Sequence, residues 1–146
     1  MNSVARHLLE GYNSLEYILL GDLRDLLEEP LDPQSMRWLS AVLDVLLENI
    51  PRQFDLVDDE QGYLHEVIEA QPNWSNEVER LRSEYVQIFR RLHELRQHLD
   101  IPEHVASHTR ELRHNLRDWM NTFCSLRRHE TRLVQTALNL EIGGGD

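Results

Sequence analysis

The stretch VASHTRELRHNLRDWMNTFCSLRRHETRLVQTA (residues 105–137) decides the fold. Its apolar residues recur at alternating steps of four and three, which keeps them on one face of an α-helix. The members of this stripe are Val105, Leu112, Leu116, Trp119, Phe123, Leu126, Leu133 and Ala137, interrupted by the polar residues Thr109 and Glu130. Because an unpartnered buried carboxylate costs several kcal/mol, we expect Glu130 to have a compensating partner in the core.

Three further stretches have the same amphipathic pattern, and they predict helices over about residues 4–28, 33–57 and 75–99, before the last helix at 103–140. Asp32 and Ser75 are the expected N-caps, and Pro51 is expected to kink its helix without ending it. The connector holds about two helical turns at 64–70. In the first helix, the predicted inward stripe is Leu8, Tyr12, Leu15, Leu19, Leu23 and Leu26.

These elements predict an all-α protein, arranged as an up-down-up-down four-helix bundle. We expect a single domain over residues 1–142, followed by a flexible, glycine-rich tail at 143–146. The three tryptophans are interpreted as packing residues. Bundle interiors are also where helical proteins build metal sites from inward carboxylates and histidines.

The composition excludes several classes of protein. The net charge of −11 argues against a nucleic-acid partner, because phosphate binding needs a basic surface. No stretch has the apolar length of a membrane span, and the first residues lack the apolar core of a signal peptide. The single cysteine, Cys124, favours a reducing compartment, so we expect a cytoplasmic protein. No arrangement of nucleophile, base and acid is present, and we expect no catalytic activity.

Three segments carry a resemblance to a known family: FDLVDDEQGYL (54–64), VERLRSEYVQI (78–88) and LRRHETRLVQTALNLEIGGGD (126–146). With the bundle length, they resemble the hemerythrin-like (HHE cation-binding) family over nearly the whole chain. The resemblance implies a four-helix bundle that holds a non-haem di-iron centre. In that family, histidines from all four helices bind the metals, and one carboxylate from each of the second and fourth helices bridges them.

Position by position, the resemblance places the bridging carboxylates at Asp58 and Glu130. The positions of the ligand histidines are occupied by Tyr12, by Phe54 with Gln53 beside it, by Tyr85, and by Leu126 with Ser125 beside it. Iron in such a core needs imidazole nitrogens as well as carboxylates. We therefore expect a lost or reduced site with no cofactor, in which Tyr12 or Tyr85 donates a hydrogen bond to Glu130. A di-iron centre is expected only if the site still functions.

One surface arrangement of histidines is a separate candidate. His104 and His108 are one helical turn apart, and Glu111 is about one turn further on, so the three side chains are a candidate surface site for a divalent metal. The alternative is an ordinary solvated helix face.

Three functions remain open from the sequence. The first is a hemerythrin-like bundle that acts as a non-catalytic binding or regulatory module. The second is an oxygen or iron sensor or carrier that keeps a carboxylate-based metal site. The third is an acidic helical adaptor that presents a helix face to a protein partner. The sequence names neither that partner nor the oligomeric state.

Overall fold

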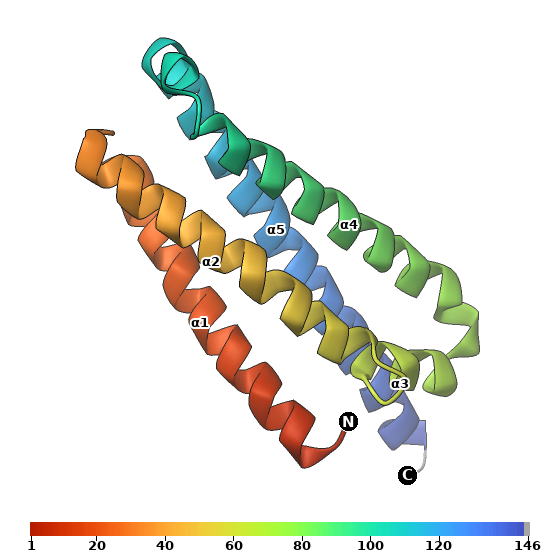
Figure 1. The fold of residues 1–146 in the computed structure, drawn as a ribbon. Coiled ribbons are helices and arrows are strands. Elements are labelled where there is room, and N and C mark those ends of the chain that lie inside the picture. The colour runs from red at the N-terminus through yellow and green to blue at the C-terminus, as the bar shows by residue number, and fades with distance from the viewer. Residues whose placement is uncertain (145–146) are drawn as a thin grey trace.

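The computed structural model describes residues 1–144, apart from the side chains of residues 104–106 and 140–144. This part of the chain contains no strand, so the predicted all-α class is confirmed. Four long helices, the short helix α3 and a 3₁₀ turn make up these described residues (Figure 1). Their bounds are α1 Ser3–Glu28, α2 Pro33–Asp58, α3 Tyr63–Ala70, η1 Pro72–Trp74, α4 Ser75–His98 and α5 Pro102–Gly144.

The helix starts follow from their capping residues. The Asp32 side chain accepts a hydrogen bond from the backbone N–H of Ser35 at 2.8 Å, and Pro33 occupies the first helical position, as predicted. Ser75 was expected to cap α4 but is its first residue, because Trp74 holds the cap position. The Ser75 hydroxyl instead donates to the carbonyl of Pro72 at 2.7 Å.

Two interruptions occur within long helices. Pro51 lies inside α2, which continues to Asp58, so the prediction that this proline does not end the helix is confirmed. In α5, His108 has φ −130° and ψ 29°, which are not helical values. The chain therefore breaks its helical path after the first turns of α5, at the end of the molecule where α4 connects to α5 (Figure 1).

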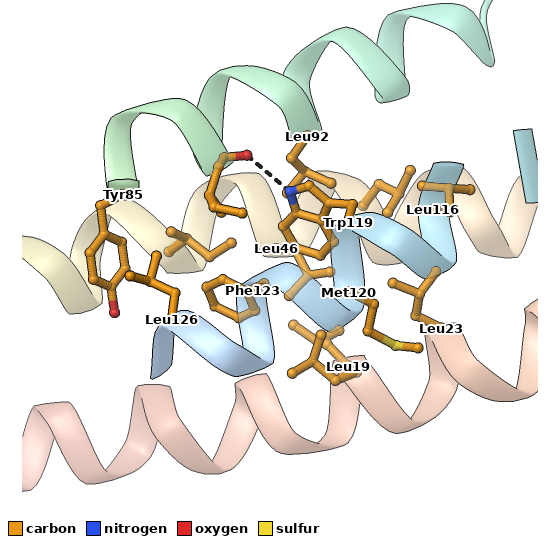
Figure 2. Close-up of a cluster of buried hydrophobic side chains, with 14 of the residues drawn as sticks. Leu19, Leu23, Leu46, Tyr85, Leu92, Leu116, Trp119, Met120, Phe123 and Leu126 are labelled. Atoms are coloured by element: carbon orange, nitrogen blue, oxygen red, sulfur yellow. Dashed lines mark hydrogen bonds between the residues drawn. The ribbon is translucent and has the colours of Figure 1, made fainter. Parts of the chain in front are cut away.

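The core lies between the four long helices (Figure 2). Trp119 and Phe123 stack with ring centroids 5.2 Å apart, and both are fully buried. The indole N–H of Trp119 donates to the carbonyl of Ile88 in α4 at 2.9 Å, which satisfies its one polar group. Leu19 and Leu23 of α1 pack into the same cluster (Figure 2).

Polar contacts fix how the helices lie against one another. Asn49 in the second half of α2 donates to the carbonyl of Tyr12 in the first half of α1 at 3.1 Å. Arg91 of α4 forms an ion pair with Asp118 of α5 at 2.9 Å. The N-terminus and the last turns of α5 lie at the same end of the molecule, near α3 (Figure 1).

The first half of α1 has a different inward face from the one predicted. Leu8 and Leu15 are exposed, whereas their neighbours Leu9 and Glu16 are buried. Because Leu8 and Leu9 are adjacent, the sequence did not determine which of them faces the core. A glutamate was not expected to face the core. Trp38 was interpreted as a packing residue, but 60% of its surface is exposed. Within the described residues, no helix has the length and apolar character needed to span a membrane.

Candidate functional site

Glu130 lies in the core, where the stripe on α5 places it. Only 7% of its surface is exposed, and the Tyr85 hydroxyl of α4 donates a hydrogen bond to its Oε2 atom. The structure therefore brings Tyr85 and Glu130 together, as one of the two predicted pairings. Among the described contacts, the Tyr12 hydroxyl does not reach Glu130, and Tyr12 contributes its main-chain carbonyl to Asn49 instead.

The main partner of Glu130 is Arg127, one helical turn earlier on α5. Its Nη1 atom donates to Glu130 Oε1 at 3.1 Å and Oε2 at 3.0 Å, and to the Tyr85 hydroxyl oxygen at 3.0 Å. Its Nε atom donates to Glu16 Oε2 at 3.2 Å, and its Nη2 atom donates to Asn13 Oδ1 at 2.7 Å. One guanidinium therefore ties α5 to both α1 and α4.

Glu16 is the second buried carboxylate of this cluster, with 8% of its surface exposed. Its Oε2 atom binds Arg127, but its buried Oε1 atom has no hydrogen-bond partner. Gln53 lies close enough to lower the pKa of Glu16, but its amide nitrogen donates a hydrogen bond to Asn13 Oδ1 at 2.8 Å. Burial raises the pKa of Glu16, and the attraction of Arg127 offsets this only in part.

The electrostatics of the cluster raise the pKa values of Tyr85 and Arg127, so both side chains keep their protons. Burial raises the pKa of Tyr85, and the negative charge of Glu130 raises it further, so the hydroxyl stays protonated and remains a donor. Burial alone would lower the pKa of Arg127, but the negative charges of Glu130 and Glu16 and the hydrogen bond to the Tyr85 hydroxyl outweigh it and raise the pKa overall. The guanidinium therefore stays charged between the two carboxylates.

Asp58, the other predicted bridging carboxylate, has a different environment. It lies at the end of α2, and its Oδ1 atom accepts a hydrogen bond from Arg82 Nε of α4 at 2.6 Å. About a third of its side chain is exposed. Within the described contacts, nothing joins Asp58 to Glu130, and each carboxylate has an arginine partner of its own.

The residues do not fit a di-iron centre. Phe54 and Tyr85 occupy two positions matched to histidines, and their rings stack with centroids 4.5 Å apart. Leu126 occupies a third such position and is buried in the core. In the described part of the chain, no group of three or more His, Cys, Asp or Glu side chains is placed to hold a metal. The described contacts around Glu130 and Arg127 involve carboxylates, a phenol and an amide, and none of them involves an imidazole.

The surface metal candidate at His104, His108 and Glu111 remains a prediction. The side chain of His104 lies outside the described residues. The non-helical backbone at His108 removes the regular one-turn spacing on which the prediction depends. Glu111 is exposed on the following turns of α5.

The cluster borders a shallow groove between α1 and α5, with a volume of about 480 Å³. Asn13, Glu16 and Arg127 line the groove, together with Arg128 and Arg132. The arrangement can hold charge and orient a hydrogen-bond network, but it presents no activated nucleophile. Its chemical role is to fix the helices through a buried ion-pair network.

Sequence reasoning missed Arg127, Glu16 and Asn13, and it named Gln53 only as the neighbour of a position matched to a histidine. One signal was available, because Arg127 and Glu130 are three residues apart on a helix, where side chains of opposite charge meet. Comparisons of the chain with family models, with curated proteins and with solved structures found no match.

Proposed function

We propose that this chain is a cytoplasmic, non-catalytic binding or regulatory module with an up-down-up-down, hemerythrin-like four-helix bundle. In this proposal, an arginine-centred ion-pair cluster replaces the ancestral di-iron site. The observation that supports it is the position of Arg127, whose guanidinium lies among Glu16, Glu130 and Tyr85 in the bundle interior. A cation that neutralises inward carboxylates is what a metal would otherwise supply.

The cross-helix contacts support the proposed topology. Residues in the first half of α1 contact residues in the second half of α2, and the first half of α4 contacts the second half of α5. The short links at residues 29–32 and 99–101 suit antiparallel neighbours. The hemerythrin-like ancestry itself is carried by the sequence resemblance around Gly62-Tyr63 and the end of α5.

Metal analysis tests this proposal. The protein would be expressed in iron-supplemented medium, reconstituted anaerobically with Fe²⁺, desalted, and measured by elemental analysis and absorption spectroscopy. We expect substoichiometric iron and no ligand-to-metal absorption band. About two retained irons per chain with such a band would overturn the proposal in favour of an iron or oxygen sensor.

A matched variant sharpens the metal analysis. Arg127→Ser removes the guanidinium and leaves Glu16, Glu130 and Tyr85 around its place. If Arg127 stands in for a metal, the variant should gain stability from millimolar Mn²⁺ or Mg²⁺, because a bound cation would relieve the two carboxylates. The wild-type melting temperature should not respond to these ions.

A second candidate function is the acidic protein-protein adaptor. It is favoured by the apolar residues that α1 leaves exposed, including Val4, Leu8, Leu15 and Ile18.

A further inference from the structure

Helix α1 has a second stripe, separate from the one that faces the core. Val4, Leu8, Gly11, Leu15 and Ile18 follow one another at steps of four, three, four and three. The four apolar side chains are between 36% and 70% exposed. Helical geometry places all five residues on one face, and this spacing is the seam pattern with which one helix receives another.

Gly11 is placed where a partner backbone would approach. A Cβ atom added to Gly11 would meet nothing within 4 Å, so no packing within this chain requires a glycine there. A glycine in a helix interior costs about 1 kcal/mol relative to alanine. Its position at the middle of the exposed stripe leaves room for the close approach of a second helix.

The same spacing continues along the second half of α1, where the stripe becomes acidic. Asp22, Asp25 and Glu29 extend the stripe at steps of four, three and four, and among the described residues none of them forms an ion pair. They line a groove of about 340 Å³ beside the exposed ring of Trp38. Carboxylates at a helix C-terminus oppose the macrodipole, so their placement weakens the isolated protein.

Two basic side chains near this end of α1 act on its core side. Arg113 and Arg117 of α5 donate to the carbonyl of Leu27 at 2.8 Å and 2.9 Å. Leu27 is buried on the core face, whereas Asp22 and Asp25 are exposed on the outer face. Among the described residues, no arginine lines the groove, so its three carboxylates face a partner without a basic residue between them.

We propose that the outer face of α1 is the docking surface for a basic amphipathic helix of a partner protein. The partner would carry an apolar 4/3 stripe that meets Val4 to Ile18, continued by Lys or Arg residues that meet the acidic half. A Lys or Arg side chain at this end also gains a cation–π contact with Trp38. Charge complementarity selects this partner, because apolar and acidic halves follow each other along one face.

A second copy of this chain is a poorer occupant. A parallel α1 pair would place acidic half against acidic half, and an antiparallel pair would place the carboxylates against apolar side chains. The chain also carries net charge −11 and contains no lysine. This inference deepens the proposed binding role by naming the partner class, but the surface is distinct from the Arg127 cluster. The metal analysis and the binding experiment below can therefore fail independently.

The experiment uses synthetic helical peptides labelled with fluorescein and measured by fluorescence anisotropy. Each probe has leucines at 4/3 spacing in one half and lysines at 4/3 spacing on the same helix face in the other half. Two probes are made, one with the leucine half first and one with the lysine half first. We expect one direction to bind the full-length protein. Replacing its lysines by glutamate, or its stripe leucines by serine, should abolish binding, because both halves contribute.

Matched variants separate this surface from the general acidity of the protein. Asp22→Asn, Asp25→Asn and Glu29→Gln together should weaken binding roughly tenfold or more. Glu60→Gln, Glu69→Gln and Glu94→Gln together remove the same charge from other exposed positions and should leave the affinity unchanged. Ile18→Ser with Leu15→Ser should also weaken binding, with circular dichroism confirming that the helices persist.

Zero-length carbodiimide crosslinking locates the peptide. Because the chain has no lysine, crosslinks join peptide lysines to carboxylates of the protein, and we expect them at Asp22, Asp25 and Glu29. Three outcomes would overturn the proposal. They are an equal weakening of binding by the two triple variants, an even spread of crosslinks over the acidic residues, and a failure of both peptide directions to bind. Sedimentation showing an Ile18-dependent dimer of the protein alone would overturn it in favour of a second copy.

Discussion

Arg127 contacts both carboxylate oxygens of Glu130 through a single nitrogen, at 3.1 Å and 3.0 Å. The two residues are one turn apart on α5, so the contact needs no other helix to form. In the core, however, this local pair becomes the centre of a network that reaches α1 and α4. Such pairs contribute little net stability over apolar packing, but breaking one partner is costly.

Removal of the cation should therefore be severe. We expect Arg127→Met to lower the free energy of unfolding by about 3–5 kcal/mol, because Glu16 and Glu130 would remain buried without a counterion. Urea denaturation followed by circular dichroism measures the change. The triple variant with Glu16→Gln and Glu130→Gln should recover most of the loss, and a triple variant as unstable as the single one would contradict this explanation.

The tyrosine hydroxyl should make a smaller contribution. Tyr85→Phe removes the donor to Glu130 and the acceptor for Arg127, and we expect a loss of about 1–3 kcal/mol. Tyr17→Phe is the matched control, because Tyr17 is 83% exposed and its hydroxyl faces solvent. That control should change stability by less than about 0.5 kcal/mol. Equal effects at both positions would remove Tyr85 from the network.

The pH dependence of stability should reveal the protonation of Glu16. Burial raises its pKa in the folded protein above the ordinary value near 4.5, so the folded state binds this proton more tightly than the unfolded state. Stability from Glu16 is therefore present below that ordinary value and is lost as pH rises through the raised pKa.

Glu16→Gln removes this titration. We expect the stability of the variant relative to wild type to increase as pH rises from 4 to 7, because wild type loses the contribution of the Glu16 proton over this range. Thermal melts across this range measure the difference. A difference that stays constant with pH would show that the Glu16 proton does not contribute.

Gly62 and Gly21 should respond oppositely to alanine. A Cβ atom on Gly62 would lie 2.5 Å from the Leu56 carbonyl oxygen and would also clash with the carbonyl of Val57, so the end of α2 would have to shift. We expect Gly62→Ala to destabilise by about 1–3 kcal/mol. Gly21 has open space around it inside a helix, so Gly21→Ala should stabilise by about 0.5–1 kcal/mol. Differential scanning calorimetry would distinguish the two, and stabilisation by both would show that the chain adjusts freely at Gly62.

Helix α4 was predictable because it buries only one face. Its stripe from Val78 to Leu95 is buried throughout, and apart from Val86 and Phe89 the residues between its members are polar, so the pattern had one solution. Helix α1 has apolar residues on two faces, at Leu8 and Leu9 and again at Leu19 and Leu20. Periodicity alone could not decide which face turned inward in its first half.

Only some residues of the buried network could be predicted from the sequence, for a related reason. Glu130 was detectable because it interrupts an otherwise apolar stripe. Glu16 interrupts the stripe of Leu9, Leu20, Leu23 and Leu27, but only if this stripe, and not the one through Leu8 and Leu15, turns inward. Arg127 lies beside the α5 stripe, and its burial depends on how three helices meet rather than on local spacing. The pairing of Tyr85 with Glu130 followed from two stripes that each pointed inward, whereas the pairing of Asp58 with Arg82 depended on where α2 ends.

The counterion at the centre of this bundle is part of the polypeptide. A bundle held by metal ions needs those ions to assemble, and a chelator can take them away. A guanidinium on α5 is delivered by translation itself, in fixed stoichiometry with the two carboxylates that it neutralises. Folding of this protein should accordingly proceed in metal-depleted cells and in the presence of strong chelators.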